Sequence, residues 1–104
     1  IEAAKIKIGT AYMAENISLN TVAASVGMSP SYFSSVFSRE VGKTFVEYLT
    51  ETRMEKAKEL LMCSPLKTSE IGYEVGYKDP HYFSYIFKKT QGCSPKDYRA
   101  RRKE

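Results

Sequence analysis

One stretch of the sequence occurs twice, first as VGMSPSYFSSVF at residues 26–37 and again as VGYKDPHYFSYIF at residues 75–87. The glycine repeats at a shift of 49 residues and the aromatic part at a shift of 50, so the second copy holds one extra residue in its turn. The shift of 50 also relates Gly42 to Gly92 and Tyr48 to Tyr98. These identities indicate an internal duplication, with too few copies for a solenoid.

Helix signals dominate both copies. Ser29, Asp79 and Ser94 each precede a proline, which is the order of an N-cap followed by proline at the first helical position. Thr44 and Glu47 have the spacing of a capping box. The chain is therefore expected to be all-α. The seven helices are expected at about 2–15, 19–26, 30–41, 45–62, 69–75, 80–90 and 95–102.

Each copy contains a short helix, a tight turn with a glycine and a longer helix, which is the plan of a helix-turn-helix unit. We expect a first helix-turn-helix subdomain at residues 1–44, a long linker helix at 45–62 and a second helix-turn-helix subdomain at 63–104. The linker helix would span roughly 27 Å at 1.5 Å per residue.

The longer helix of each copy has an apolar stripe and a polar stripe at helical spacing. The apolar stripes, expected to face the core, are Phe33, Val36, Phe37 and Val41 in one copy and Phe83, Ile86 and Phe87 in the other. The polar stripes are Ser31, Ser34, Ser35 and Ser38, and then His81, Ser84, Tyr85 and Lys88. Such stripes are ordinarily solvated helix faces, but their recurrence at matched places in two helix-turn-helix frames favours a function.

A helix-turn-helix protein places the N-terminal part of its second helix in the major groove. The candidates for base contact are Ser31, Ser34, Ser35, His81, Ser84 and Tyr85. Serine hydroxyls discriminate little between base edges, whereas a lysine suits guanine or a phosphate, and a tyrosine suits a phosphate or a thymine methyl group.

Phosphate contacts would add affinity and salt dependence without sequence information. The candidates are Ser29, Ser38, Arg39, Lys43, Lys88, Lys89, Lys96, Arg99, Arg101, Arg102 and Lys103. The basic run at residues 101–103 equally fits a solvated tail. Helix N-termini, expected at Ser18, Ser29, Thr68, Asp79 and Ser94, would add N–H donors, with Asp79 acting only as a cap.

Arg53 lies on the same face of the predicted linker helix as Leu49, Ala57, Leu60 and Leu61. A charge on an apolar face needs a partner, such as a glutamate or the carbonyl groups at a helix C-terminus. We interpret Arg53 as structural rather than DNA-contacting.

Composition limits the other classes of function. The 104 residues carry a formal charge of +4, which is compatible with a polyanionic partner. Cys63 and Cys93 lack metal-ligand spacing and His81 is the only histidine, so we expect no metal site and no cofactor. Both cysteines are interpreted as free thiols, buried or half-buried, in a reducing cytoplasm.

No apolar run approaches the ~20 residues of a membrane span. The start at Ile1 without a methionine suggests a piece of a longer protein.

These patterns together resemble the AraC/XylS family of bacterial transcription regulators. The most specific part is IGYEVGY at 71–77 followed by YFSYIFKK at 82–89 and GCSPKDYR at 92–99, and VAASVGMS at 22–29 also fits. The resemblance implies two recognition helices in successive major grooves and control of transcription, most often activation through RNA polymerase. It also implies base contacts at the six candidate positions above. The serines of the first copy depart from the larger amide and arginine readers of some members, which puts strong base specificity of that copy in doubt.

Within the family, the chain looks most like the C-terminal output domains of response regulators. The expected partners are therefore double-stranded DNA, RNA polymerase and an N-terminal receiver or effector-sensing domain. Two alternatives are a helical module that binds RNA polymerase or a sister domain without reading DNA, and an enzyme with Cys63 or Cys93 as an acceptor thiol. Neither cysteine has an activating base or cation in its sequence neighbourhood, so we expect no enzyme activity.

Overall fold

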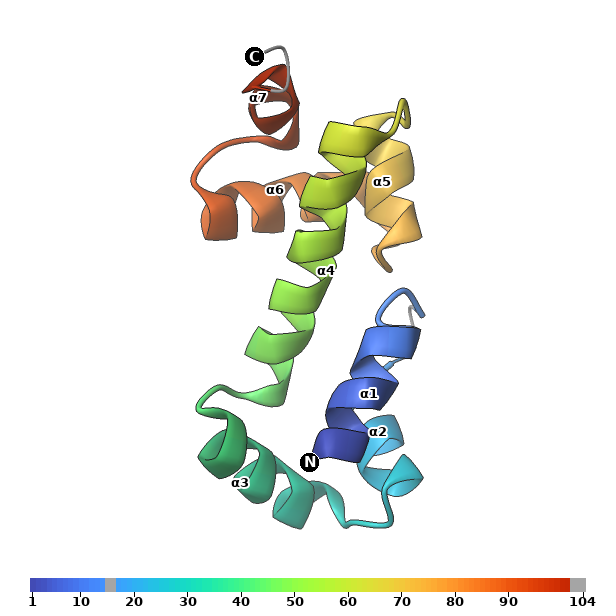
Figure 1. Ribbon diagram of the computed structural model, residues 1–104, viewed down its shortest axis with the longest axis vertical. Coiled ribbons are helices and arrows are strands. Elements are labelled where there is room, and N and C mark those ends of the chain that lie inside the picture. Colours follow the sequence, from blue (N-terminus) through green and yellow to red (C-terminus); the bar gives the residue numbers. More distant parts are fainter. Residues whose placement is uncertain (15–16, 102–104) are drawn as a thin grey trace. The chain divides into compact units, whose positions relative to one another are not determined.

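The computed structural model describes residues 1–14 and 17–101, and within those ranges it contains seven helices and no strands (Figure 1). The helices are α1 (Glu2–Ala11), α2 (Leu19–Ser25), α3 (Pro30–Val41), α4 (Phe45–Cys63), α5 (Thr68–Glu74), α6 (Pro80–Gln91) and α7 (Pro95–Ala100). The expected all-α fold with seven helices is confirmed. None of the helices in the described ranges is both long and apolar enough to cross a membrane.

Several helix boundaries differ from the prediction, most of them by one or two residues. The first helix was expected to reach residue 15 but ends at Ala11, after which the N–H of Ala14 donates to the Ala11 carbonyl at 3.0 Å in a turn. The fifth helix begins at Thr68 rather than having Thr68 as its cap. The residue before it, Lys67, donates its N–H to the Glu70 carboxylate at 2.7 Å. An acidic side chain in the first turn thus accepts a hydrogen bond from a backbone N–H at the start of the helix.

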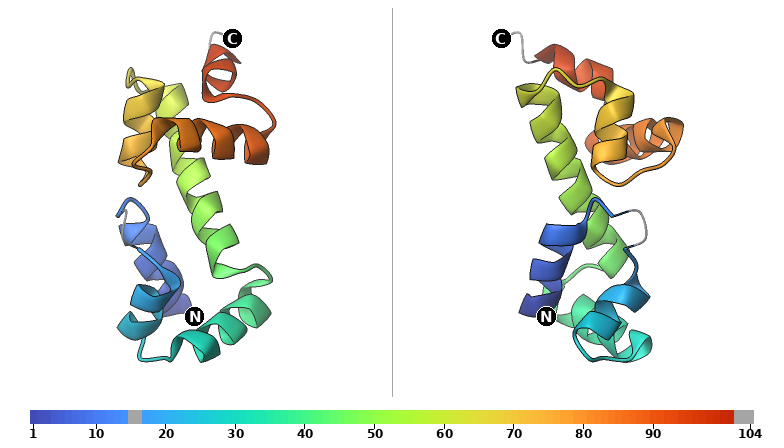
Figure 2. Two further views of the ribbon diagram at one scale, coloured as in Figure 1. Left: turned by 180° about the vertical axis from the view of Figure 1, so that it is seen from behind. Right: turned by 90° about the vertical axis from the view of Figure 1, so that its right-hand side faces the viewer.

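The chain divides into two compact units, Ile1–Thr52 and Arg53–Glu104, and the boundary falls inside α4. Unit 1 holds α1, α2, α3 and the first part of α4, whereas unit 2 holds the rest of α4 with α5, α6 and α7. In each unit a longer helix, α3 or α6, follows the short helix α2 or α5 after a tight turn (Figure 2). Our division into two subdomains and a separate linker helix stays a prediction.

The core of unit 1 is built around the two phenylalanines of α3. Phe33 and Phe37 are fully buried with ring centroids 5.5 Å apart, and they pack with Ile8 and Val22 of the preceding helices. The first part of α4 closes this core with Phe45, whose ring meets those of Phe33 and Phe37 edge-on at 6.1 and 6.0 Å. Aromatic packing of this kind fixes the rotation of α3 about its own axis.

Unit 2 has a similar pair of phenylalanines in its core. Phe83 and Phe87 are fully buried with centroids 5.9 Å apart, and Phe87 meets Tyr98 at 5.7 Å. The matching contact in unit 1, between Phe37 and Tyr48, spans 5.5 Å. The predicted core positions on α3 and α6 are confirmed as buried except Val41 and Ile86, which are half-buried.

Glycines end both longer helices. Gly42 and Gly92 adopt left-handed conformations with φ of 81° and 86°, and each donates its N–H to a carbonyl of the last turn. This conformation suits glycine, which lacks a Cβ. The chain can therefore reverse direction directly after α3 to begin α4, and directly after α6 to begin α7.

A different constraint applies to Gly72, which is buried in α5. A Cβ built on Gly72 would lie 2.9 Å from the Phe83 ring, closer than side chains approach one another. The matched residue of the first copy, at a shift of 49, is Ala23 in α2. The short helix α5 therefore lies against α6 at a distance that only glycine allows.

We predict that Gly72→Ala lowers the free energy of unfolding by about 1–3 kcal/mol, because the added methyl group overpacks the contact with Phe83. The matched control is Gly9→Ala in α1, where a Cβ would meet nothing within 4 Å. Gly9→Ala should be neutral or stabilising by up to about 1 kcal/mol, through helix propensity alone. Urea unfolding followed by circular dichroism measures both. Equal effects of the two substitutions would contradict the packing argument.

Candidate nucleic-acid interface

The exposed face of α3 is small and polar. Ser29 caps the helix by accepting the N–H of Tyr32 at 3.3 Å, and Pro30 occupies the first turn. With Phe33 and Phe37 held in the core, Ser31 and Ser35 are exposed. Ser34 and Ser38 are half-buried at the edges of this face, and Arg39 is exposed in the last turn. The four serines thus share one side of α3, as the sequence predicts.

The same side of α6 carries larger and more basic groups. Asp79 caps this helix by accepting the N–H of His81 at 2.9 Å, which agrees with its expected role. His81, Tyr85, Lys88 and Lys89 are exposed, and Ser84 is half-buried beside them. The structure therefore brings His81, Ser84 and Tyr85 together with Lys88 and Lys89 on α6.

The two faces differ in charge. Residues 80–91 contain two lysines and no acidic residue, whereas α3 carries Arg39 next to Glu40, both exposed. The face of α6 therefore presents net positive charge to a phosphate backbone, and α3 presents almost none.

Two further tyrosines on these helices are exposed beside the predicted polar stripes. Tyr32 on α3 and Tyr82 on α6 were recognised as repeat positions only, yet they are 60% and 51% exposed. Helical spacing places each of them one step of about 100° before a core-facing phenylalanine. That spacing alone does not predict exposure, because Val36 precedes Phe37 by the same step and is buried.

Arg99, a predicted phosphate contact, has a different environment from the one expected. Its guanidinium donates to the carbonyl of Leu61 at 3.1 Å and to that of Ser64 at 3.0 Å. These carbonyls lie at the C-terminal end of α4, where helix groups lack intrahelical partners. These contacts give Arg99 a structural role in unit 2, and its contact with a phosphate stays a prediction.

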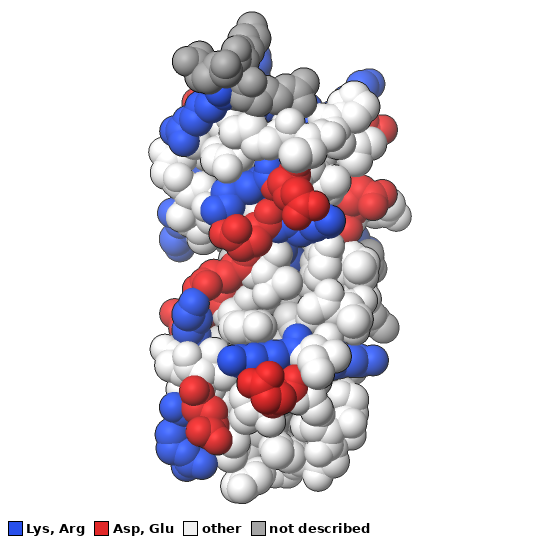
Figure 3. Space-filling view, viewed as in Figure 1, with Lys and Arg blue, Asp and Glu red and all other residues white. Residues whose placement is uncertain are grey.

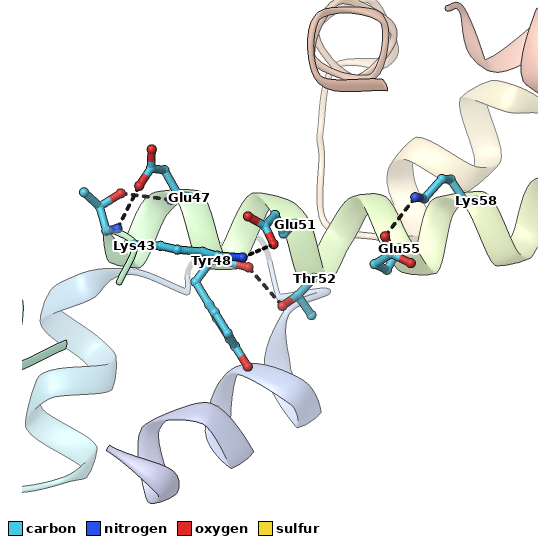
Figure 4. A network of polar contacts seen from close by, with 8 residues as sticks. Lys43, Glu47, Tyr48, Glu51, Thr52, Glu55 and Lys58 are labelled. Atoms are coloured by element: carbon cyan, nitrogen blue, oxygen red, sulfur yellow. Dashed lines mark hydrogen bonds and ion pairs between the residues drawn. The ribbon is translucent and has the colours of Figure 1, made fainter. Parts of the chain in front are cut away.

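The other basic candidates are scattered. The Lys43 ammonium lies 2.6 Å from the Glu51 carboxylate on α4, in an exposed pair that contributes little to stability (Figure 4). Lys96 is exposed on α7, and the Arg101 guanidinium lies 5.6 Å from the Tyr98 ring. Arg102 and Lys103 lie outside the described residues.

An acidic stripe runs along α4. It consists of Glu47, Glu51, Glu55 and Glu59, all exposed at four-residue spacing. Acidic side chains gather along α4 in Figure 3, and Figure 4 shows the Lys58 ammonium meeting Glu55, a contact of 2.8 Å. Within the capping box at the start of this helix, Glu47 accepts the N–H of Thr44 at 2.8 Å, as predicted. Three of these carboxylates are paired, Glu51 with Lys43, Glu55 with Lys58 and Glu59 with Lys56.

The cysteines depart in part from expectation. Both are free thiols, but Cys63 is exposed at the last position of α4, so its predicted burial is wrong. Cys93 is half-buried, as expected. Among the residues that the structure describes, no three His, Cys, Asp or Glu side chains are grouped closely enough to hold a metal ion.

Comparison with known proteins explains this geometry. A family model described as a helix-turn-helix domain matches residues 22–101. The chain belongs to the AraC-type helix-turn-helix family. It is 40% identical to the C-terminal domain of AraT, a response regulator from Geobacillus stearothermophilus, with a TM-score of 0.94 over 97% of this chain and 84% of that chain.

Two further relatives bear on the activity of this AraC-type domain. The DNA-binding domain of AdpA, a global transcriptional factor solved with a target DNA, is 25% identical with a TM-score of 0.88 over 93% of this chain and 86% of that chain. The arabinose operon regulatory protein of Escherichia coli K12 is 35% identical over 82% of this chain and 29% of its own length. The AraC-type domain thus binds DNA sequence-specifically for transcription regulation and is not an enzyme.

The chain spans only part of its curated relatives. It covers 20%, 30% and 29% of the lengths of three regulators that it matches. The activities, signals and partners of those whole proteins are therefore not assigned to this chain by the similarity.

In this AraC-type domain Arg53 has the buried environment that the sequence predicts. It is 8% exposed, and its guanidinium lies 4.9 Å from the centre of the Tyr77 ring. The contact between Arg53 and the Tyr77 ring was not predicted. A cation over a ring face is stabilised most when both groups are shielded from water.

We predict that Arg53→Lys lowers the free energy of unfolding by roughly 1–2 kcal/mol, because a lysine keeps the charge but loses the planar stacking on Tyr77. The control is Arg39→Lys on the exposed face of α3, which should change stability by less than about 0.5 kcal/mol. Chemical denaturation of both variants tests this difference. A loss at Arg53 no larger than the loss at Arg39 would count against a structural role for the guanidinium.

Proposed function

We propose that α3 and α6 enter successive major grooves of one asymmetric duplex site, and that α6 supplies most of the affinity. The observation that supports this most strongly is the face of α6, where His81, Tyr85, Lys88 and Lys89 are exposed on a capped helix without an acidic residue. Adjacent grooves lie roughly 34 Å apart, so the site would cover about 15–20 base pairs. A mismatch with this pitch would require bent DNA or the release of one unit.

The faces of α3 and α6 would make different kinds of contact with DNA. His81, Ser84 and Tyr85 would contact base edges, while Lys88 and Lys89 would reach phosphates or a guanine. The face of Ser31, Ser34 and Ser35 would approach the groove closely but discriminate weakly, since hydroxyls pair with several base edges. We propose that unit 1 contributes through backbone contacts, with Ser29, Ser38, Arg39 and Lys43 as candidates, and through DNA shape.

The partners follow from the family and from the response-regulator relative. We propose that the whole protein carries an N-terminal receiver or effector-sensing domain that controls exposure or dimerisation of this domain. We further propose that it activates transcription in the cytoplasm by contacting RNA polymerase from promoter-bound DNA. The similarity to the C-terminal domain of the response regulator AraT supports the first part of this proposal.

Titration with random duplex DNA at low salt, followed by selection of bound sites from a random duplex library, tests the proposed function. We expect measurable binding to any duplex and enrichment of an asymmetric motif with two half-sites. A domain that only binds other proteins would show negligible affinity in the titration. Enrichment of a single half-site would show that one unit alone engages DNA.

We predict that Lys88→Ala weakens binding and reduces the slope of log affinity against log salt by about one, because one phosphate contact would be lost. The matched control is Lys5→Ala on α1, which removes the same charge from a residue whose ammonium lies 3.9 Å from the Glu2 carboxylate. Its slope should stay that of the unmodified domain. Fluorescence anisotropy with the selected duplex at several salt concentrations gives both slopes. An unchanged slope for Lys88→Ala would contradict a phosphate contact.

A further inference from the structure

Ring and cation contacts form a continuous row through unit 2. The guanidinium of buried Arg53 lies 4.9 Å from the centre of the Tyr77 ring, and the Tyr77 and Tyr82 rings are 5.8 Å apart. The Tyr82 and Tyr85 rings are 6.4 Å apart, and the Lys89 ammonium lies 5.7 Å from the Tyr85 ring. We call Arg53, Tyr77, Tyr82, Tyr85 and Lys89 the tyrosine row. It begins in the core and ends on the exposed face of α6.

Unit 1 has not kept this row. The matched positions of the first copy are Ala4, Met28, Tyr32, Ser35 and Arg39. Only one of these five is aromatic, so the same frame cannot build a row of rings. The tyrosine row is therefore a property of the second copy and does not follow from the helix-turn-helix fold.

The exposed part of the row is an ordered apolar surface on a polar helix. Tyr82 and Tyr85 are 51% and 57% exposed, although each ring has ring or cation neighbours. Neighbours of this kind restrict the side-chain rotamers, which lowers the entropy lost when a partner covers the rings. Rings restricted in this way would lose less conformational entropy on binding than mobile exposed tyrosines.

The major groove offers one apolar group at its base edges, the methyl group of thymine. We propose that Tyr82 and Tyr85 read thymine methyl groups in the half-site bound by unit 2. This inference rests on the proposed function, because it requires α6 to enter the major groove. A tyrosine hydroxyl bonded to a phosphate would instead add affinity that does not depend on the base.

The test replaces thymine by deoxyuridine, one position at a time, in the duplex selected by the unmodified domain. Deoxyuridine keeps the base pair and lacks only the methyl group. At one or more positions of one half-site, binding should weaken about fourfold, as expected for burial of one CH₂-sized group. No weakening at any position would overturn the inference without any substitution in the protein.

Variants then assign the effect to the rings. Tyr85→Ser introduces the residue found at the matched position of unit 1, Ser35, and should abolish the effect of deoxyuridine at one position or more. Tyr85→Phe should keep it, since the ring remains and only the hydroxyl is lost. Tyr82→Ala should reduce it, whereas Tyr73→Ala should leave it unchanged, because Tyr73 is a 69% exposed tyrosine of α5 outside the row.

The outcomes separate this inference from the proposed function. An equal deoxyuridine effect in Tyr85→Ser and the unmodified domain, or its loss in Tyr85→Phe, would overturn methyl reading while duplex binding stands. Failure of the unmodified domain to bind any duplex at low salt would overturn both. Tighter binding to the single strand than to the duplex would identify the rings as a stacking platform for unpaired bases and would overturn the inference too.

Discussion

The packing of two phenylalanines one helical turn apart on α3 and on α6 is the contact on which the rest of each unit depends. Phe33 and Phe37, like Phe83 and Phe87, are fully buried. Two buried rings at this spacing set the rotation of a helix about its axis, and the opposite side then has to face solvent. The caps Ser29 and Asp79 add the starting point of each helix, so position and orientation are both fixed locally.

The duplication shows which positions were constrained and which were free. The paired core residues are identical, with phenylalanine at 33 and 83 and at 37 and 87. Among the paired positions of the two polar stripes, only Ser34 and Ser84 are the same. The other three positions carry serine in the first copy and histidine, tyrosine and lysine in the second. A frame maintained by packing has thus acquired two faces with different chemistry, one small and neutral, the other aromatic and basic.

Local signals in the sequence were sufficient to predict the seven helices, the two phenylalanine pairs and the polar stripes. Serine–proline and aspartate–proline pairs mark helix starts, and burial follows from helical periodicity. The environments of Arg53 and Arg99 could not be predicted in this way. Arg99 meets carbonyls 35 and 38 residues earlier in the chain, and Arg53 meets a ring in the turn before α6. Such partners depend on how helices pack, which periodicity does not describe. Burial of Cys63 was wrong for the same reason, since a position at a helix end has no neighbours that the pattern can supply.

The close approach of Gly72 to Phe83 has a consequence for the history of the duplication. Two freshly copied halves can exchange segments by recombination, because each still fits the place of the other. Here α2 carries Ala23 where α5 carries Gly72, and the methyl group of that alanine would collide with the Phe83 ring. Transfer of the α2 sequence into the second half would therefore be penalised at this point. One additional carbon atom in α5 would thus oppose exchange of this segment between the halves.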